Sequence, residues 1–215
     1  VVGPFAPFNP PRHYVVVMEY AGALHLSKHI KALLAQTRES TLRPPVVHSF
    51  ASQQVAAVLH LRTCNVCHRD IKPENWVVSD DHKDLRLTDF GLAVQVQGPR
   101  QTLKQSCGSL PFCAPEVYAS NLMQNDCVGY DGFAADIWSL GVNFMELICG
   151  PFSIEASLGW LPNHPTEFPA LLQGLNSIPE HWAGAYDEKR ELHAKLADTV
   201  SFMLRCEPCD RAKIG

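Results

Sequence analysis

Hydrophobic positions divide the first third of the chain into one strand-like and two helix-like segments. Residues 13–20 are rich in β-branched and aromatic residues, which predicts a buried strand, followed by a connector of small residues. From Leu24 to Gln36 the apolar spacing becomes helical. Pro44 and Pro45 are expected to close the next loop, before a second helix at about Ser49 to Arg62.

Two short strands are expected after the second helix. The segments WVVS and LRLTDF flank a polar turn, and Leu85 and Leu87 alternate with Arg86 and Thr88. This alternation predicts a hairpin with one buried face. The following residues, about 93–115, have the Gly, Ser, Gln and Pro content of a functional loop.

The remainder of the chain has the pattern of helices. Residues 134–149 are apolar on nearly all sides, which predicts a central, buried helix. Two further helical patterns lie near residues 165–175 and 188–204. The expected fold is therefore mainly α, with few and short strands.

Composition and charge argue against several classes of function. The 215 residues are 46% hydrophobic, and the net charge of -4 provides no positive field for nucleic acid or an acidic membrane. The longest apolar runs contain Glu19 and Glu146 and are too short to span a bilayer. The N-terminal residues also lack the pattern of a signal peptide. We therefore expect a cytoplasmic or nuclear protein that binds neither nucleic acid nor membrane.

Three short motifs carry the chemistry of the chain. HRDIKPEN covers residues 68–75, TDFG covers residues 88–91, and Ala-Pro-Glu covers residues 114–116. Their types and order resemble the catalytic loop, the Asp-Phe-Gly motif and the Ala-Pro-Glu motif of eukaryotic protein kinases. A given tripeptide occurs by chance at about one position in eight thousand, so three in the family's order are not a coincidence.

The resemblance implies transfer of the γ-phosphoryl group of ATP. Asp70 would accept or orient the proton of the substrate hydroxyl, and Lys72 would neutralise charge on the transferred group. Asn75 and Asp89 would hold Mg2+, and Asp89 would thereby also bind the nucleotide. Because Lys72 follows Asp70 by two positions and Ser109 precedes the Ala-Pro-Glu motif, the sequence resembles serine/threonine kinases. Its partners would be protein substrates with Ser or Thr acceptors.

The segment before the catalytic loop resembles the kinase hinge. Met18 matches the gatekeeper residue, and the Glu19 carbonyl and the Ala21 amide match the backbone groups that bind adenine. Leu26 and Val77 would pack against the adenine ring.

Several other residues match positions with architectural roles in the family. His68 and Phe90 resemble residues that pack beneath the site. Asp136 would bond the backbone of the catalytic loop, and Arg211 would form a buried ion pair with Glu116.

The loop before the Ala-Pro-Glu motif departs from the family at the position that is usually a phosphorylated Thr. The chain has Gln105 there, although Arg69, whose guanidinium would bind the phosphate of the loop, is present. A regulatory phosphate would therefore have to sit on Thr102 or Ser106.

The sequence lacks the parts that grip the phosphates of ATP in this family. No G-x-G occurs in it, and neither Lys nor Glu precedes Glu19. The implied fold is a protein-kinase-like C-terminal lobe with short β-hairpins at the catalytic cleft. Residues 1–24 would be a remnant of the N-terminal lobe with its hinge, and residues 25–215 the helical lobe, truncated at its end. We expect such a fragment to be inactive alone.

Two further interpretations follow from the resemblance. The segments CGSLPFCAPEVY and YDGFAADIWSLGV are most similar to the calcium/calmodulin-dependent and metabolic-sensor branch of kinases. The alternative function is a pseudokinase-like binding or scaffold module without transfer activity. Loss of Asp70 or Asp89 would have favoured that alternative, and both residues are present.

The eight cysteines are scattered without a regular framework, which favours reduced thiols over disulfides. Cys64, Cys67 and His68 also spell the C-x-x-C-H pattern of haem attachment, and Cys206 with Cys209 forms a second C-x-x-C. The two patterns together would suggest a zinc site. The kinase resemblance makes both sites less favoured, because it gives His68 a more specific role.

Overall fold

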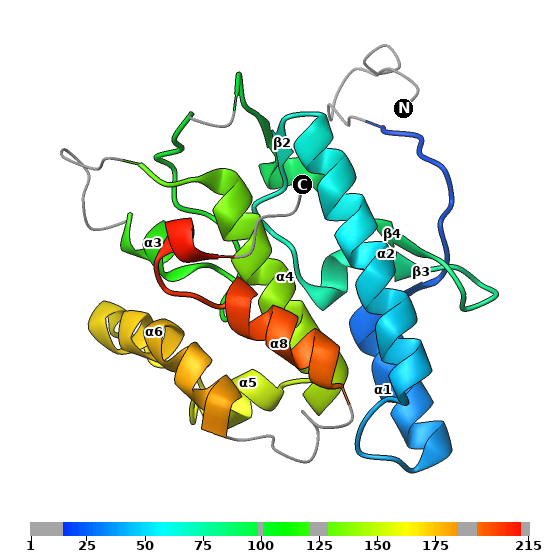
Figure 1. Cartoon of the computed structure of the whole chain (residues 1–215). Helices are drawn as coiled ribbons and strands as arrows, with labels where there is room; N and C mark the ends of the chain where they lie inside the picture. Colours follow the sequence, from blue (N-terminus) through cyan, green and yellow to red (C-terminus); the bar gives the residue numbers. More distant parts are fainter. Residues whose placement is uncertain (1–14, 99–100, 121–128, 185–192, 212–215) are drawn as a thin grey trace, which may run out of the picture.

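The computed structural model describes residues 15–98, 101–120, 129–184 and 193–211 (Figure 1). In these ranges helices predominate, as the sequence predicted, and the strands are short. The elements are, in order, β1 (Leu24–His25), α1 (Leu26–Thr37), α2 (Pro44–Thr63), β2 (Val66–Cys67), η1 (Pro73–Asn75), β3 (Trp76–Val78), β4 (Leu85–Leu87), η2 (Phe90–Leu92), β5 (Val94–Gln95), α3 (Pro115–Ala119), α4 (Gly132–Cys149), α5 (Ser153–Ser157), α6 (Phe168–Gly184), α8 (Ala194–Met203) and η3 (Pro208–Asp210).

Helix α4 forms the centre of the core and confirms the predicted buried helix. Helices α2 and α8 pack against it (Figure 1), and Trp138 in its middle is 0% exposed. At its N-terminus the Asp131 carboxylate accepts hydrogen bonds from the amides of Phe133 at 2.9 Å and Ala134 at 3.2 Å. These bonds satisfy two amides that have no partner within the helix.

Helices α1 and α2 confirm the two helices predicted before the catalytic loop, but both start elsewhere than predicted. Helix α1 begins at Leu26, because Leu24 and His25 form β1. The prediction that Pro44 and Pro45 belong to the preceding loop is wrong, because α2 begins at Pro44. Proline is well tolerated in the first turn of a helix, where its missing N–H would have had no partner anyway.

Strands β3 and β4 form the predicted antiparallel hairpin, with Val78 opposite Leu85. Trp76, Val78 and Leu85 are buried, whereas Arg86 is exposed, which confirms the single buried face. Strand β1 pairs with the other edge of β3. A second pairing, between β2 and β5, was not predicted, and it fixes the start of the 93–115 loop beside the catalytic loop.

Residues 15–20 do not form the strand that their composition predicted. They have no regular secondary structure, and their side chains are exposed, with Val16 at 64% and Met18 at 74%. A strand needs a neighbour for its backbone hydrogen bonds, and none of the described strands pairs with this segment. Residues 13–14 of the predicted strand lie outside the described residues.

The two helical patterns near the end of the chain correspond to α6 and α8. Helix α6 extends beyond the predicted residue 175 and continues through Pro179. Helix α8 begins at Ala194, and residues 188–192 of the predicted segment lie outside the described residues. Among all helices in the described ranges, none has the length and apolar content needed to cross a bilayer.

The connection between residues 20–25 and the hairpin includes a close backbone contact at Gly22. Asp80 in the hairpin turn accepts hydrogen bonds from the Tyr20 hydroxyl at 3.3 Å and the Ala23 amide at 3.2 Å. Gly22 has φ of 154°, and a Cβ there would lie 1.9 Å from the Val78 carbonyl oxygen. The site therefore has no space for a side chain.

We expect Gly22→Ala to lower the free energy of unfolding by about 1–3 kcal/mol, because the segment must move off β3 or adopt a strained backbone. Thermal melting measures this effect. The matched control is Gly98→Ala, since a Cβ at Gly98 would meet nothing within 4 Å. Equal melting temperatures for the two variants would contradict the close contact.

Candidate active site

Three of the predicted site residues meet around Asp70, in the loop between β2 and η1. The Lys72 Nζ lies 2.8 Å from the Asp70 Oδ2. The Asn75 side-chain amide donates to the same carboxylate oxygen at 3.1 Å and to the Asp70 main-chain oxygen at 2.8 Å. The short spacing of these residues thus closes into one cluster.

Ser109 completes this cluster from a distant part of the chain. Its hydroxyl donates to the Asp70 Oδ1 at 2.8 Å and accepts a hydrogen bond from the Lys72 Nζ at 2.6 Å. In the sequence, Ser109 indicated only the type of acceptor. Its fixed position before the Ala-Pro-Glu motif was the available signal, but the contact itself depends on how the loop crosses the catalytic loop.

Asp70 is held as a carboxylate. Burial raises the pKa of its side chain, but hydrogen bonds from Lys72 and Ser109, together with the charge of Lys72, outweigh burial and hold the pKa below its usual value. At neutral pH the cluster therefore presents an ionised carboxylate beside a cation. Such a pair suits the acceptance of a hydroxyl proton next to developing negative charge.

Asp136 of α4 anchors the catalytic loop from the core, as predicted. Its carboxylate accepts hydrogen bonds from the main-chain amides of His68 at 2.7 Å and Arg69 at 2.8 Å. Burial raises the pKa of Asp136 to about 7, while these two bonds and the Arg69 charge favour the ionised form. The anchor matters because Arg69 has φ of 68°, a conformation that costs energy unless its surroundings impose it.

Asp89 lies at the start of η2 and is exposed. Its carboxylate accepts a hydrogen bond from the Gly91 amide at 3.2 Å. The preceding residue, Thr88, donates to the Asn75 main-chain oxygen through its amide at 2.8 Å and its hydroxyl at 3.1 Å. These bonds bring the Asp89 segment to Asn75. The Asn75 amide nitrogen bonds Asp70. The Asn75 Oδ1 is therefore the atom that suits a cation such as Mg2+, which prefers oxygen ligands.

His68 and Phe90 differ in how far they meet the predicted packing role. His68 is fully buried, its Nε2 lies 3.0 Å from the Thr88 carbonyl oxygen, and its ring contacts Phe90 edge to face at 5.0 Å. The prediction is therefore confirmed for His68. It is wrong for Phe90 as a core residue, since that side chain is 49% exposed.

The residues expected to contact adenine differ in how far their side chains are exposed. Met18 and Glu19 are exposed, and Ala21 and Val77 are half-buried. Leu26 is 1% exposed and belongs to the hydrophobic core. The predicted contact between Leu26 and adenine is not supported, because burial at the start of α1 leaves almost none of its surface available.

Arg211 and Glu116 form the predicted ion pair between the Ala-Pro-Glu motif and the end of the described chain. The guanidinium binds both carboxylate oxygens, with the Nη2 to Oε2 distance at 2.7 Å. The Arg211 side chain is 1% exposed and lies over the Trp138 ring at 5.1 Å. It also donates to the main-chain oxygens of Ala134, Arg205 and Cys206.

The cysteine patterns are not assembled into a metal site in the part of the chain that the structure describes. Cys64 is exposed, whereas Cys67 is buried, and burial raises the pKa of the Cys67 thiol to about 12. Within the described ranges, no three His, Cys, Asp or Glu side chains gather to hold a metal ion.

Comparison with known proteins points to a single family. The family described as "Protein kinase domain" matches residues 1–214. The chain is 39% identical over 127 residues to CBL-interacting serine/threonine-protein kinase 15 of Arabidopsis thaliana. The aligned stretch covers 57% of this chain and 28% of that protein. It is 31% identical over 173 residues to developmentally-regulated protein kinase 1 of Dictyostelium discoideum, covering 80% of this chain and 22% of the relative.

A third relative extends this similarity to a human protein. The chain is 30% identical over 176 residues to SNF-related serine/threonine-protein kinase of Homo sapiens, which covers 82% of this chain and 20% of the relative. The chain thus spans less than a third of the length of each of these relatives, whose shares are 28%, 22% and 20%.

Proposed function

The chain belongs to the protein kinase domain family, and from this premise we propose that it carries the catalytic loop of a serine/threonine kinase. The reaction is transfer of the γ-phosphoryl group of ATP to Ser or Thr hydroxyls of protein substrates. The observation that supports it best is the cluster in which Asp70, Lys72 and Ser109 contact one another within 2.8 Å.

The residues of this cluster have distinct roles in the proposed reaction. Asp70 accepts or orients the proton of the acceptor hydroxyl, and Lys72 neutralises charge on the transferred group. The Ser109 hydroxyl keeps these two side chains in place, because it bonds both. Asn75 and Asp89 are the residues that would hold Mg2+, which neutralises phosphate charge when bound and is generally used with ATP in this family.

We further propose that residues 25–215 form the helical kinase lobe and that residues 1–24 belong to the N-terminal lobe with its hinge. The Glu19 carbonyl, the Ala21 amide and the half-buried Val77 would then contact adenine beside Met18. Within the family, we place the chain in the calcium/calmodulin-dependent and metabolic-sensor branch.

The test is peptide phosphorylation by the full-length gene product with Mg2+ and ATP. Libraries with Ser, Thr or Tyr acceptors should show transfer to Ser and Thr only. The Asp70→Asn variant provides the background. Transfer that does not exceed this background, in a protein that still binds nucleotide, would contradict the proposal and favour the scaffold function.

A further inference from the structure

The loop that carries Ser109 is tied to the core through Tyr130, a residue without a role in the proposed chemistry. Tyr130 stands just before α4 and is 4% exposed. Its main-chain amide donates to the Leu103 oxygen and its main-chain oxygen accepts from the Leu103 amide, both at 2.8 Å. Leu103 is itself only 8% exposed. The backbone bridge is therefore anchored by a core side chain at each end.

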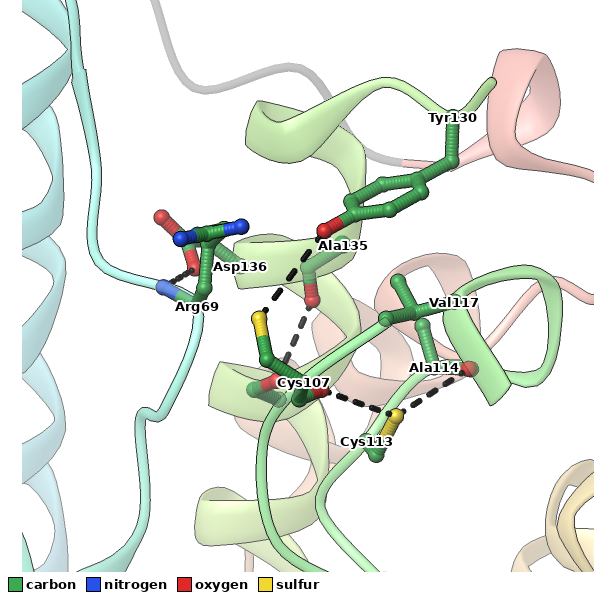
Figure 2. A pocket seen from close by; sticks show the side chains of 9 residues that line it. Arg69, Cys107, Cys113, Ala114, Val117, Tyr130, Ala135 and Asp136 are labelled. Carbon is green, nitrogen blue, oxygen red and sulfur yellow. Dashed lines mark hydrogen bonds between the residues drawn. The ribbon is translucent and has the colours of Figure 1, made fainter. Parts of the chain in front are cut away.

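The Tyr130 phenol makes a second set of contacts with the same loop. Its hydroxyl donates to the Gln105 main-chain oxygen at 2.8 Å and lies 4.0 Å from the Cys107 thiol. Arg69 and Tyr130 also line the same small cavity as Cys107. Figure 2 shows the Tyr130 hydroxyl pointing toward Cys107, with Arg69 on the catalytic-loop side.

Burial keeps the Tyr130 phenol neutral. It raises the pKa of Tyr130 well above its usual value, although the charge of the nearby Arg69 opposes the shift. The neutral hydroxyl therefore keeps the proton that it donates to the Gln105 main-chain oxygen.

Arg69 and the loop that Tyr130 contacts both adjoin Asp70. Arg69 directly precedes Asp70, and its Nε donates to the Leu92 main-chain oxygen at 2.6 Å. On the loop side, Gly108 packs against Arg69 so closely that a Cβ would lie 2.9 Å from the Arg69 carbonyl oxygen. The next residue, Ser109, bonds Asp70. A shift of residues 105–108 would therefore move a hydrogen-bond partner of the proposed catalytic carboxylate.

We propose that Tyr130 is a positioning residue that holds residues 103–109 on the catalytic loop without a phosphate on that loop. The inference rests on the proposed function and deepens it by naming what keeps the site ordered. The phenol lines the same cavity as Arg69, and it donates to the main-chain oxygen of residue 105. The Gln105 side chain, which cannot be phosphorylated, is therefore compatible with an ordered loop.

The experiment compares Tyr130→Phe with the parent in the full-length gene product after phosphatase treatment. Mass spectrometry first establishes that Thr102 and Ser106 carry no phosphate. The dephosphorylated parent should remain active. The variant should show about tenfold to hundredfold faster amide hydrogen exchange across residues 103–109, the range expected for a buried hydrogen bond left unmade. Its kcat should fall by a similar factor, with an unchanged KM for ATP.

Tyr118→Phe is the matched control, because it removes the same hydroxyl from a half-buried ring that stacks on Phe168. It should exchange and turn over like the parent. If Tyr130→Phe does not fold, Leu103→Ala removes the buried side chain at the other end of the backbone bridge and should loosen the same residues.

Parental exchange and kcat in Tyr130→Phe would overturn the inference. So would a parent that is inactive until Thr102 or Ser106 is phosphorylated, although the proposed function would then stand. If no protein transfers phosphate under any condition, the proposed function fails. The exchange rates still decide whether Tyr130 holds the loop.

Discussion

Asp70→Asn in the full-length gene product should lower kcat for peptide phosphorylation by about 10²–10⁴-fold and leave nucleotide affinity nearly unchanged. Asparagine keeps the size of the side chain but cannot take up a proton. The contacts of the Asp70 carboxylate are with Lys72, Asn75 and Ser109, none of which belongs to the proposed adenine site. Steady-state kinetics and a nucleotide-binding titration measure the two effects separately.

Asp89→Ala should instead lower the affinity for nucleotide. Because Asp89 is exposed beside Asn75 and proposed to hold Mg2+, its loss should weaken ATP binding with Mg2+ and change it little when the cation is chelated. Asp81→Asn supplies the control, since this carboxylate lies in the exposed hairpin turn and bonds Ser79. Turnover near the parental rate in Asp70→Asn would show that another group takes the proton.

The short motifs predicted much of the site because their spacing is local. Asp70, Lys72 and Asn75 lie within six residues, so one loop conformation brings them together. The motifs also predicted two long-range contacts, from Asp136 to the catalytic loop and from Arg211 to Glu116. These rested on family positions rather than on any pattern in the residues themselves.

The sequence could not predict features that depend on what packs against a segment. Residues 15–20 have strand-like composition, yet strand formation requires a neighbouring backbone, which composition does not reveal. Leu26 begins a helix and is buried in the core, although its position suggested contact with adenine. Tyr130 escaped notice for a different reason. Its role depends on main-chain oxygens of Leu103 and Gln105 that only the folded loop brings to it.

Arg211→Ala should lower the free energy of unfolding by about 3–5 kcal/mol, because it leaves the Glu116 carboxylate without its buried partner. For a chain of this size that loss corresponds to a fall in melting temperature of roughly 6–20 °C. The guanidinium is 1% exposed and holds Glu116 and several main-chain oxygens at once. Its removal therefore breaks a network that joins the Ala-Pro-Glu motif, α4 and the segment before η3.

Arg43→Ala provides the matched control, since it breaks an exposed ion pair in which the Arg43 and Glu39 side chains are 70% and 39% exposed. Its expected cost is at most about 1 kcal/mol. Combining Arg211→Met with Glu116→Gln should cost less than the sum of the two single changes, because neither partner is then left as an unpaired charge. Chemical denaturation of all variants measures these differences. If Arg211→Ala and Arg43→Ala unfold at the same denaturant concentration, the buried pair does not stabilise the fold.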